Sequence, residues 1–401
     1  MIFTLSRWLQ ISFFNLLLVA LLGVIMRYKI AYSLPFIDQK NFLHGHSHFA
    51  FSGWITQALM CLLVHYLYKM GNTVAFARYR ILLYANLITA YGMLITFPVQ
   101  GYAFLSISFS TLSLFVSYWF SIMYWKDLNR LRIGGSVHLW FKTALTFNAI
   151  SSFGPYALAF MLATKNIQPD NYLASVYFFL HFQYNGWFFF ACMGLWTHYL
   201  LQVGIKEMEL KGVYVLFALA CVPAYFLSAL WLPVPVWLYW FTVLAVILQL
   251  TGWWRLLWII RKYLPSVQKN MDPLSRVLFF LCAIALTAKL LLQSGSVIPS
   301  LSKLAFGFRP IVIGYLHLVL LGVITLFIIS YVVSQSLIGI TKRVKQGIVI
   351  FTAGIIINEV LLLIQGIADL YYFPIPVINI LLLCTALALF AGMLLINVRG
   401  K

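Results

Sequence analysis

The chain carries few charges, and very few of them are negative. Among its 401 residues there are 27 Lys and Arg but only 8 Asp and Glu, and charged residues make up 9% of the total. Soluble globular domains contain about 25% charged residues. Hydrophobic residues instead reach 63%, with a mean hydropathy of +0.95. The composition therefore excludes a water-soluble domain and predicts an integral membrane protein whose main surroundings are membrane lipids.

The sequence also has few cysteines, and its basic residues do not form a single patch. The five cysteines fall inside apolar stretches and form no Cys-x-x-Cys pair, which argues against a disulfide framework. The absence of Cys-x-x-Cys-His leaves covalent c-type haem unsupported. Lys and Arg residues lie between the apolar stretches and are not interleaved with aromatic residues in one patch, so no nucleic-acid partner is expected.

Apolar runs of about 20 residues, the length that crosses a bilayer as a helix, recur along the whole chain. We predict an all-α polytopic membrane protein, a twelve-transmembrane-helix bundle that forms a single domain over residues 1–401. The predicted spans are 8–29, 43–68, 79–99, 103–125, 139–163, 172–201, 212–232, 235–258, 275–294, 311–335, 347–367 and 375–397.

The basic residues predict an orientation. If the N-terminus is cytoplasmic, nineteen Lys and Arg residues, among them Arg132, Arg399 and Lys401, lie on the inner side and six on the outer side. The positive-inside rule then places both termini in the cytoplasm. We expect a multi-pass protein of the cell inner (cytoplasmic) membrane.

Histidines mark the polar chemistry inside the spans. His44, His46 and His48 open the second span, and His181 and His317 lie in the sixth and tenth. On the predicted topology all five occupy the outer half of the membrane, where a histidine is costly and therefore suggests function. Positions i and i+4 share a helix face, so His44 and His48 are expected to point one way and His46 another.

The surroundings of these histidines carry a resemblance. His44-Gly45 followed by His48 and Phe49-Ala-Phe-Ser-Gly53, together with Gly314-Tyr-Leu-His317, resembles the second and tenth helices of haem-copper oxidase and nitric oxide reductase catalytic subunits (subunit I). The resemblance implies a low-spin haem b held by His317 and by His44 or His48. His181-Phe-Gln-Tyr-Asn-Gly186 resembles the sixth helix, whose histidine is a copper ligand.

The sequence also departs from that family. Tyr315 stands where the family has the high-spin haem histidine, and the seventh span lacks the family's His-His pair. The oxygen-reducing centre is thus incomplete, although His46 or His48 could join His181 in holding copper or non-haem iron. His46-Ser-His48 with Gly53, and His317 with Gly322, also resemble the NnrS family, twelve-span haem-copper proteins linked to nitric oxide stress.

These observations predict a membrane haem protein that acts in electron transfer or in respiratory or nitric-oxide-related redox chemistry. Arg309, with Lys289, is a candidate partner of the haem propionates, and electrons would come from quinol or an electron-donating subunit. An oxidoreductase activity on a small gas would require the second metal. The alternatives are a non-catalytic haem sensor or assembly factor, and a cofactor-free ion- or proton-coupled transporter that uses histidines, Lys289 and Glu359 as relays.

Overall fold

The computed structural model describes residues 4–131, 134–269 and 271–398, and within these residues all regular structure is helical. Arg132, Arg399 and Lys401 of the topology prediction lie outside the described residues. Helices are expected because lipid offers the backbone no hydrogen-bond partner, so each span must pair its own N–H and C=O groups. Ten helices among the described residues are long and apolar enough to cross a membrane, as a multi-pass membrane protein requires.

The twelve predicted spans all coincide with helical segments, but two of these segments are not among the ten. One is α8 (Pro169–His181) with η2 (Phe182–Phe188) and α9 (Phe189–Gln202), which has His181, Gln183 and Asn185 at its middle. The other is α10 (Glu207–Cys221), which begins with charged residues and gives way to the 3-10 segment η3 (Pro223–Ser228). The count of twelve transmembrane helices therefore stays a prediction.

The chain packs as two compact units, Trp125–Ser334 and the combination of Met1–Tyr124 with Gln335–Lys401. The first and last helices of the chain belong to the combined unit, here called unit 1. Its elements are α1 (Leu5–Ala31), α2 (Gln39–Phe49), η1 (Ala50–Thr56), α3 (Gln57–Lys69), α4 (Ala75–Gln100), most of α5 (Phe104–Arg130), α17 (Lys342–Leu370) and α18 (Ile378–Asn397).

The continuous middle of the chain, unit 2, holds the remaining helices. Besides α8, η2, α9, α10 and η3, these are α6 (Ser136–Ser151), α7 (Phe153–Ala163), α11 (Val236–Lys262), α12 (Leu264–Lys269), α13 (Pro273–Gly295), α14 (Pro299–Gly307), α15 (Arg309–His317), η4 (Leu318–Thr325) and α16 (Leu326–Ser334).

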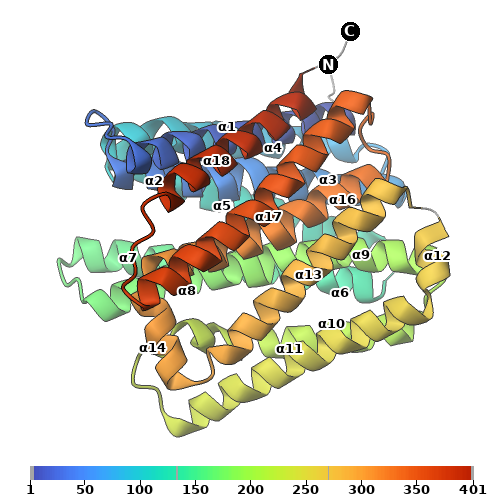
Figure 1. The fold of residues 1–401 in the computed structure, drawn as a ribbon. Helices are drawn as coiled ribbons and strands as arrows, with labels where there is room; N and C mark the ends of the chain where they lie inside the picture. Colours follow the sequence, from blue (N-terminus) through green and yellow to red (C-terminus); the bar gives the residue numbers. More distant parts are fainter. Residues whose placement is uncertain (1–3, 132–133, 270, 399–401) are drawn as a thin grey trace. The chain divides into compact units, whose positions relative to one another are not determined.

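Glycines allow the closest helix pair of unit 1, α17 and α18, which lie side by side in Figure 1. A Cβ atom on Gly347 would meet the carbonyl oxygen of Gly392 at 2.7 Å, and one on Gly392 would meet the backbone nitrogen of Phe351 at 2.7 Å. Small residues of this kind let membrane helices approach backbone to backbone. α18 also packs on α1, where the Asn397 amide donates to the Phe13 carbonyl at 3.1 Å.

Several helices begin at residues whose chemistry suits a helix start. Asp38 accepts from the backbone N–H of Asn41 at 2.7 Å, and Asp272 accepts from those of Leu274 and Ser275 at 2.9 and 3.1 Å. These carboxylates satisfy N–H groups that have no partner inside the helix. Few as they are, the acidic residues therefore include helix caps.

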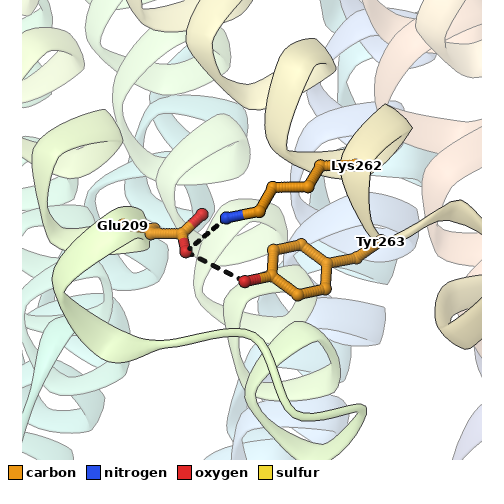
Figure 2. Close-up of polar contacts among 3 residues, drawn as sticks. All are labelled: Glu209, Lys262 and Tyr263. Atoms are coloured by element: carbon orange, nitrogen blue, oxygen red, sulfur yellow. Dashed lines mark hydrogen bonds and ion pairs between the residues drawn. The ribbon is translucent and has the colours of Figure 1, made fainter.

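The acidic residue Glu209 instead ties two helices of unit 2 together (Figure 2). At the first turn of α10, its carboxylate accepts from the Lys262 ammonium at 3.2 Å and from the Tyr263 hydroxyl at 3.0 Å, at the end of α11. Partial withdrawal from water acts to raise the pKa of Glu209, but these two hydrogen bonds and the charge of Lys262 outweigh it and lower the pKa. The contact joins the start of α10 to the end of α11, at the ends of this packed pair that lie opposite their connection through η3.

We expect Tyr263→Phe to raise the pKa of Glu209, because the carboxylate loses one of the donors that stabilise its charged form. A depressed carboxyl pKa contributes stability above the pKa of the unfolded chain, and that contribution is lost as pH falls through the folded value. The chain contains three Glu residues, so ¹³C-carboxyl NMR on Glu-labelled protein can follow the titration, with Glu209→Gln to assign the signal. An unchanged Glu209 titration in Tyr263→Phe would contradict the contact.

Candidate functional site

Three helices of the chain change winding directly after a histidine. The π-helical segments η1, η2 and η4 begin at Ala50, Phe182 and Leu318, two residues after His48 and one after His181 and His317. They are the π-helical segments found in the described part of the chain. π-helical turns are rare and occur often at functional sites. The three helices singled out by their histidines in the sequence thus share an unusual backbone feature.

Each of these segments also contains a glycine five residues after its histidine, namely Gly53, Gly186 and Gly322. A Cβ atom at Gly53 would meet the Phe49 ring at 2.5 Å, and one at Gly186 would meet the Phe147 side chain at 2.6 Å. At Gly322 the nearest atom, the Cβ of Ala285, would be 3.1 Å away. The glycines therefore let the widened turns pack tightly, most strictly at η1 and η2.

Side-chain amides from two neighbouring helices donate hydrogen bonds to carbonyl groups of η1, the π-helical segment of unit 1. Asn15 of α1 donates to the carbonyl of Gly53 at 2.6 Å, and Asn86 of α4 donates to that of Ser52 at 3.0 Å. Both asparagines are at most 2% exposed, and the Tyr91 hydroxyl donates to Asn15 at 2.7 Å. The turn after His48 is therefore fixed by hydrogen bonds from two neighbouring helices.

Cysteine thiols approach the corresponding carbonyl groups in unit 2. The Sγ of Cys221 lies 3.8 Å from the carbonyl oxygen of Asn185 in η2, and the Sγ of Cys282 lies 3.3 Å from that of Val323 in η4. A thiol is a weak donor. These two cysteines thus have a specific role that their apolar sequence surroundings do not indicate.

The three histidines of α2 point in two directions, as the helical spacing predicts. The His44 and His48 rings both pack against Phe97 and Tyr102, and His48 stacks on Phe97 with centroids 4.4 Å apart. His46 instead lies next to α1, with its Cε1 3.8 Å from the position of a Cβ on Gly23. His44 and His48 therefore share a face that His46 does not.

His44 and His48 differ in how their ring nitrogens are engaged. The Nε2 atom of His48 is hydrogen-bonded to the Tyr102 hydroxyl at 3.1 Å. The Nε2 atom of His44 is buried and has no hydrogen-bond partner among the described residues. Of the two, His44 thus presents a nitrogen that no described hydrogen bond occupies.

His317 ends α15 with its ring oriented by its own helix. Its Nδ1 donates to the carbonyl of Ile313 at 2.8 Å, so in the neutral ring Nε2 carries the lone pair. Histidines that bind metals usually donate their other ring N–H to a carbonyl or carboxylate in this way. The bond fixes the tautomer of the neutral His317 ring, and metal binding through Nε2 stays a prediction.

Both ring nitrogens of His181 are engaged inside unit 2. Nε2 donates to the carbonyl of Cys221 at 2.9 Å, and Nδ1 accepts from the Asn185 amide at 3.1 Å. That carbonyl is available because the backbone N–H of Tyr225, its partner in a regular helix, bonds to Val222 where α10 gives way to η3. His181 therefore serves a structural role in this arrangement, and a metal would have to displace one of the two bonds.

The other polar residues that the sequence singles out, Arg309, Lys289 and Glu359, lie on three different helices. Arg309 is exposed at the start of α15, whereas Lys289 is buried in α13 at 5% exposure. The Glu359 carboxylate accepts from the adjacent Asn358 amide at 3.1 Å, a contact within α17.

The described residues contain no group of three His, Cys, Asp or Glu side chains that could hold a metal ion. His46 and His48 belong to unit 1 and His181 to unit 2, so the predicted copper or non-haem iron set stays a prediction. No protein-family model matches the chain, and no curated protein is similar to it.

We expect Asn15→Leu to lower the free energy of unfolding by about 1 kcal/mol, because the carbonyl of Gly53 and the hydroxyl of Tyr91 both lose a buried partner. Denaturant titration of the purified protein in detergent measures this. Ser108→Ala is the control, since its exposed hydroxyl bonds only within α5. Equal losses in the two variants would contradict a special role for Asn15.

We expect His181→Leu to lower the free energy of unfolding by about 1–3 kcal/mol, because the buried Cys221 carbonyl loses its donor. His181→Gln keeps an N–H donor and should recover part of the loss. The same unfolding measurement applies, with copper and iron content determined in parallel. A variant that loses a metal but keeps its stability would instead identify His181 as a ligand.

Proposed function

We propose that this protein is a membrane haem protein that binds haem b and acts in electron transfer or nitric-oxide-related respiratory redox chemistry. The observation that carries the proposal is the π-helical turn directly after each of His48, His181 and His317. Backbone hydrogen bonding is disturbed in this way only where packing or function maintains it. The motifs around these histidines resemble those of haem-copper proteins, and this resemblance is the reason for proposing haem as the bound group.

The candidate iron ligands are those that the sequence predicts, His317 of unit 2 and a histidine of α2 in unit 1. The Nδ1 hydrogen bond of His317 to Ile313 places the lone pair of the neutral ring on Nε2, the atom that would bind the iron. On α2, the buried Nε2 of His44 has no hydrogen-bond partner among the described residues, whereas that of His48 is engaged with Tyr102. The local surroundings therefore favour His44 over His48, a choice that the sequence leaves open.

Two imidazole ligands would saturate a haem iron, which then supplies one-electron transfer. The chain's own contribution is to set the tautomer of His317 and to enclose the imidazole face of α2 with the aromatic rings of Phe97 and Tyr102. Exposed Arg309 is the candidate propionate partner. Quinol or an electron-donating subunit in the cytoplasmic membrane would be the electron source.

The optical spectrum of the purified protein, oxidised and then reduced with dithionite, tests the proposal together with iron and copper analysis. We expect sharp reduced α and Soret bands that disappear in His317→Ala and His44→Ala. His48→Ala should keep them, perturbed by the loss of stacking on Phe97. His65→Ala on α3 is the control, because that histidine lies four residues before the end of the helix, away from η1.

A wild-type protein from haem-replete cells that is colourless and free of metal would overturn the haem proposal. That result would favour the cofactor-free transporter, in which Lys289 and Glu359 provide the titratable groups. Loss of the bands in His48→Ala but not in His44→Ala would still support haem binding, but it would identify His48 instead of His44 as the ligand on α2.

A further inference from the structure

Lys289 is a buried lysine of unit 2 that has no acidic partner among the described residues. Its side chain is 5% exposed, and no hydrogen bond or ion pair joins its ammonium group to any described residue. It lies in the second half of α13, within a span of 23 residues. An unpaired ammonium at such depth is costly unless a charge or strong hydrogen bonds compensate it.

Lys289 lines a small enclosed cavity to which five helical elements contribute. The cavity has a volume of about 10 Å³, close to the minimum that holds one water-sized occupant. Its walls combine polar groups with aromatic and aliphatic side chains: Asn185, Phe189, Phe190, Phe217, Cys221, Gln249, Leu286, Lys289 and Leu290. No carboxylate is among these residues.

A second buried polar group meets Lys289 at this cavity. Gln249 of α11 is 6% exposed, and its amide forms no hydrogen bond with a described residue. Asn185 already uses its amide N–H toward His181, which removes that donor from the cavity. Two buried polar side chains therefore face one space that is large enough for a single occupant.

The chemistry of the walls selects the class of occupant. The Lys289 ammonium brings a positive charge and three N–H donors, and Gln249 adds amide donors. Buried charges are normally paired, and here the chain supplies no negative partner. A small monovalent anion would neutralise the charge and accept these hydrogen bonds, whereas a neutral water would leave the charge uncompensated.

We propose that the cavity of Lys289 and Gln249 is a binding site for one small monovalent anion of the halide class. The site lies wholly in unit 2 and is independent of the proposed haem function. The anion would link α11 and α13 through these two side chains, so its binding would stabilise the folded protein.

Chloride dependence of thermal unfolding tests the site. We expect the wild-type midpoint to rise saturably, by on the order of 2–4 °C, when sodium chloride or bromide replaces sodium gluconate at constant ionic strength. Lys289→Met should lose this response, and Gln249→Leu should require a higher halide concentration. Lys142→Met is the matched control and should keep the full response, since this lysine of α6 lies over the Trp125 ring, 5.4 Å from its centroid.

Equal midpoints of the wild-type protein in chloride and gluconate, or a full response in Lys289→Met, would overturn the proposal. If Lys289→Met does not fold, the anomalous scattering of wild-type crystals soaked in bromide shows whether the anion occupies the cavity. A bromide peak beside Lys289 supports the site, and density for water alone overturns it. The optical spectrum of Gln249→Leu should match that of the wild type, which separates this test from that of haem binding.

Discussion

A carbonyl group that leaves the regular helix inside a membrane has no water to bind, and this constraint shapes the interior of both units. In each π-helical segment, at least one backbone carbonyl is contacted by a side chain from a neighbouring helix. Asn15 and Asn86 do this at η1, and the thiols of Cys221 and Cys282 approach the carbonyls of η2 and η4. The helices around these turns are thereby fixed in position.

The same constraint explains why the ring nitrogens of the histidines differ in their hydrogen bonds. His317 donates through Nδ1 to a carbonyl of its own helix, which fixes the tautomer of the neutral ring. His181 donates through Nε2 to the Cys221 carbonyl at the end of α10 and accepts at Nδ1 from the Asn185 amide. Both ring nitrogens of His181 are therefore engaged. Histidines with similar sequence surroundings therefore differ in chemistry, because different backbone carbonyls are available to them.

Much of the helical layout can be predicted from the sequence because it follows from local composition. The runs 79–99 and 347–367 lie inside α4 and α17, and the i, i+4 spacing places His44 and His48 on one face. The π-helical turns, the bond from Asn15 to Gly53 and the cavity of Lys289 could not be predicted. Each depends on a partner 38 or more residues away, or on a one-residue change of winding that apolar periodicity does not record.

The winding of η1 also fixes the direction of the histidines that precede it. A π-helical turn holds one residue more than the regular helix, and each residue of a regular helix turns the chain by about 100°. If the same residues wound as a regular helix, the extra residue would swing His44 and His48 away from Phe97 by roughly that angle. Deleting one residue between Ala50 and Thr56 would remove the extra residue together with the widening, and would leave their direction nearly unchanged. The widened turn thus works as a rotational register for α2, because it absorbs one residue that regular winding would convert into a rotation of this face.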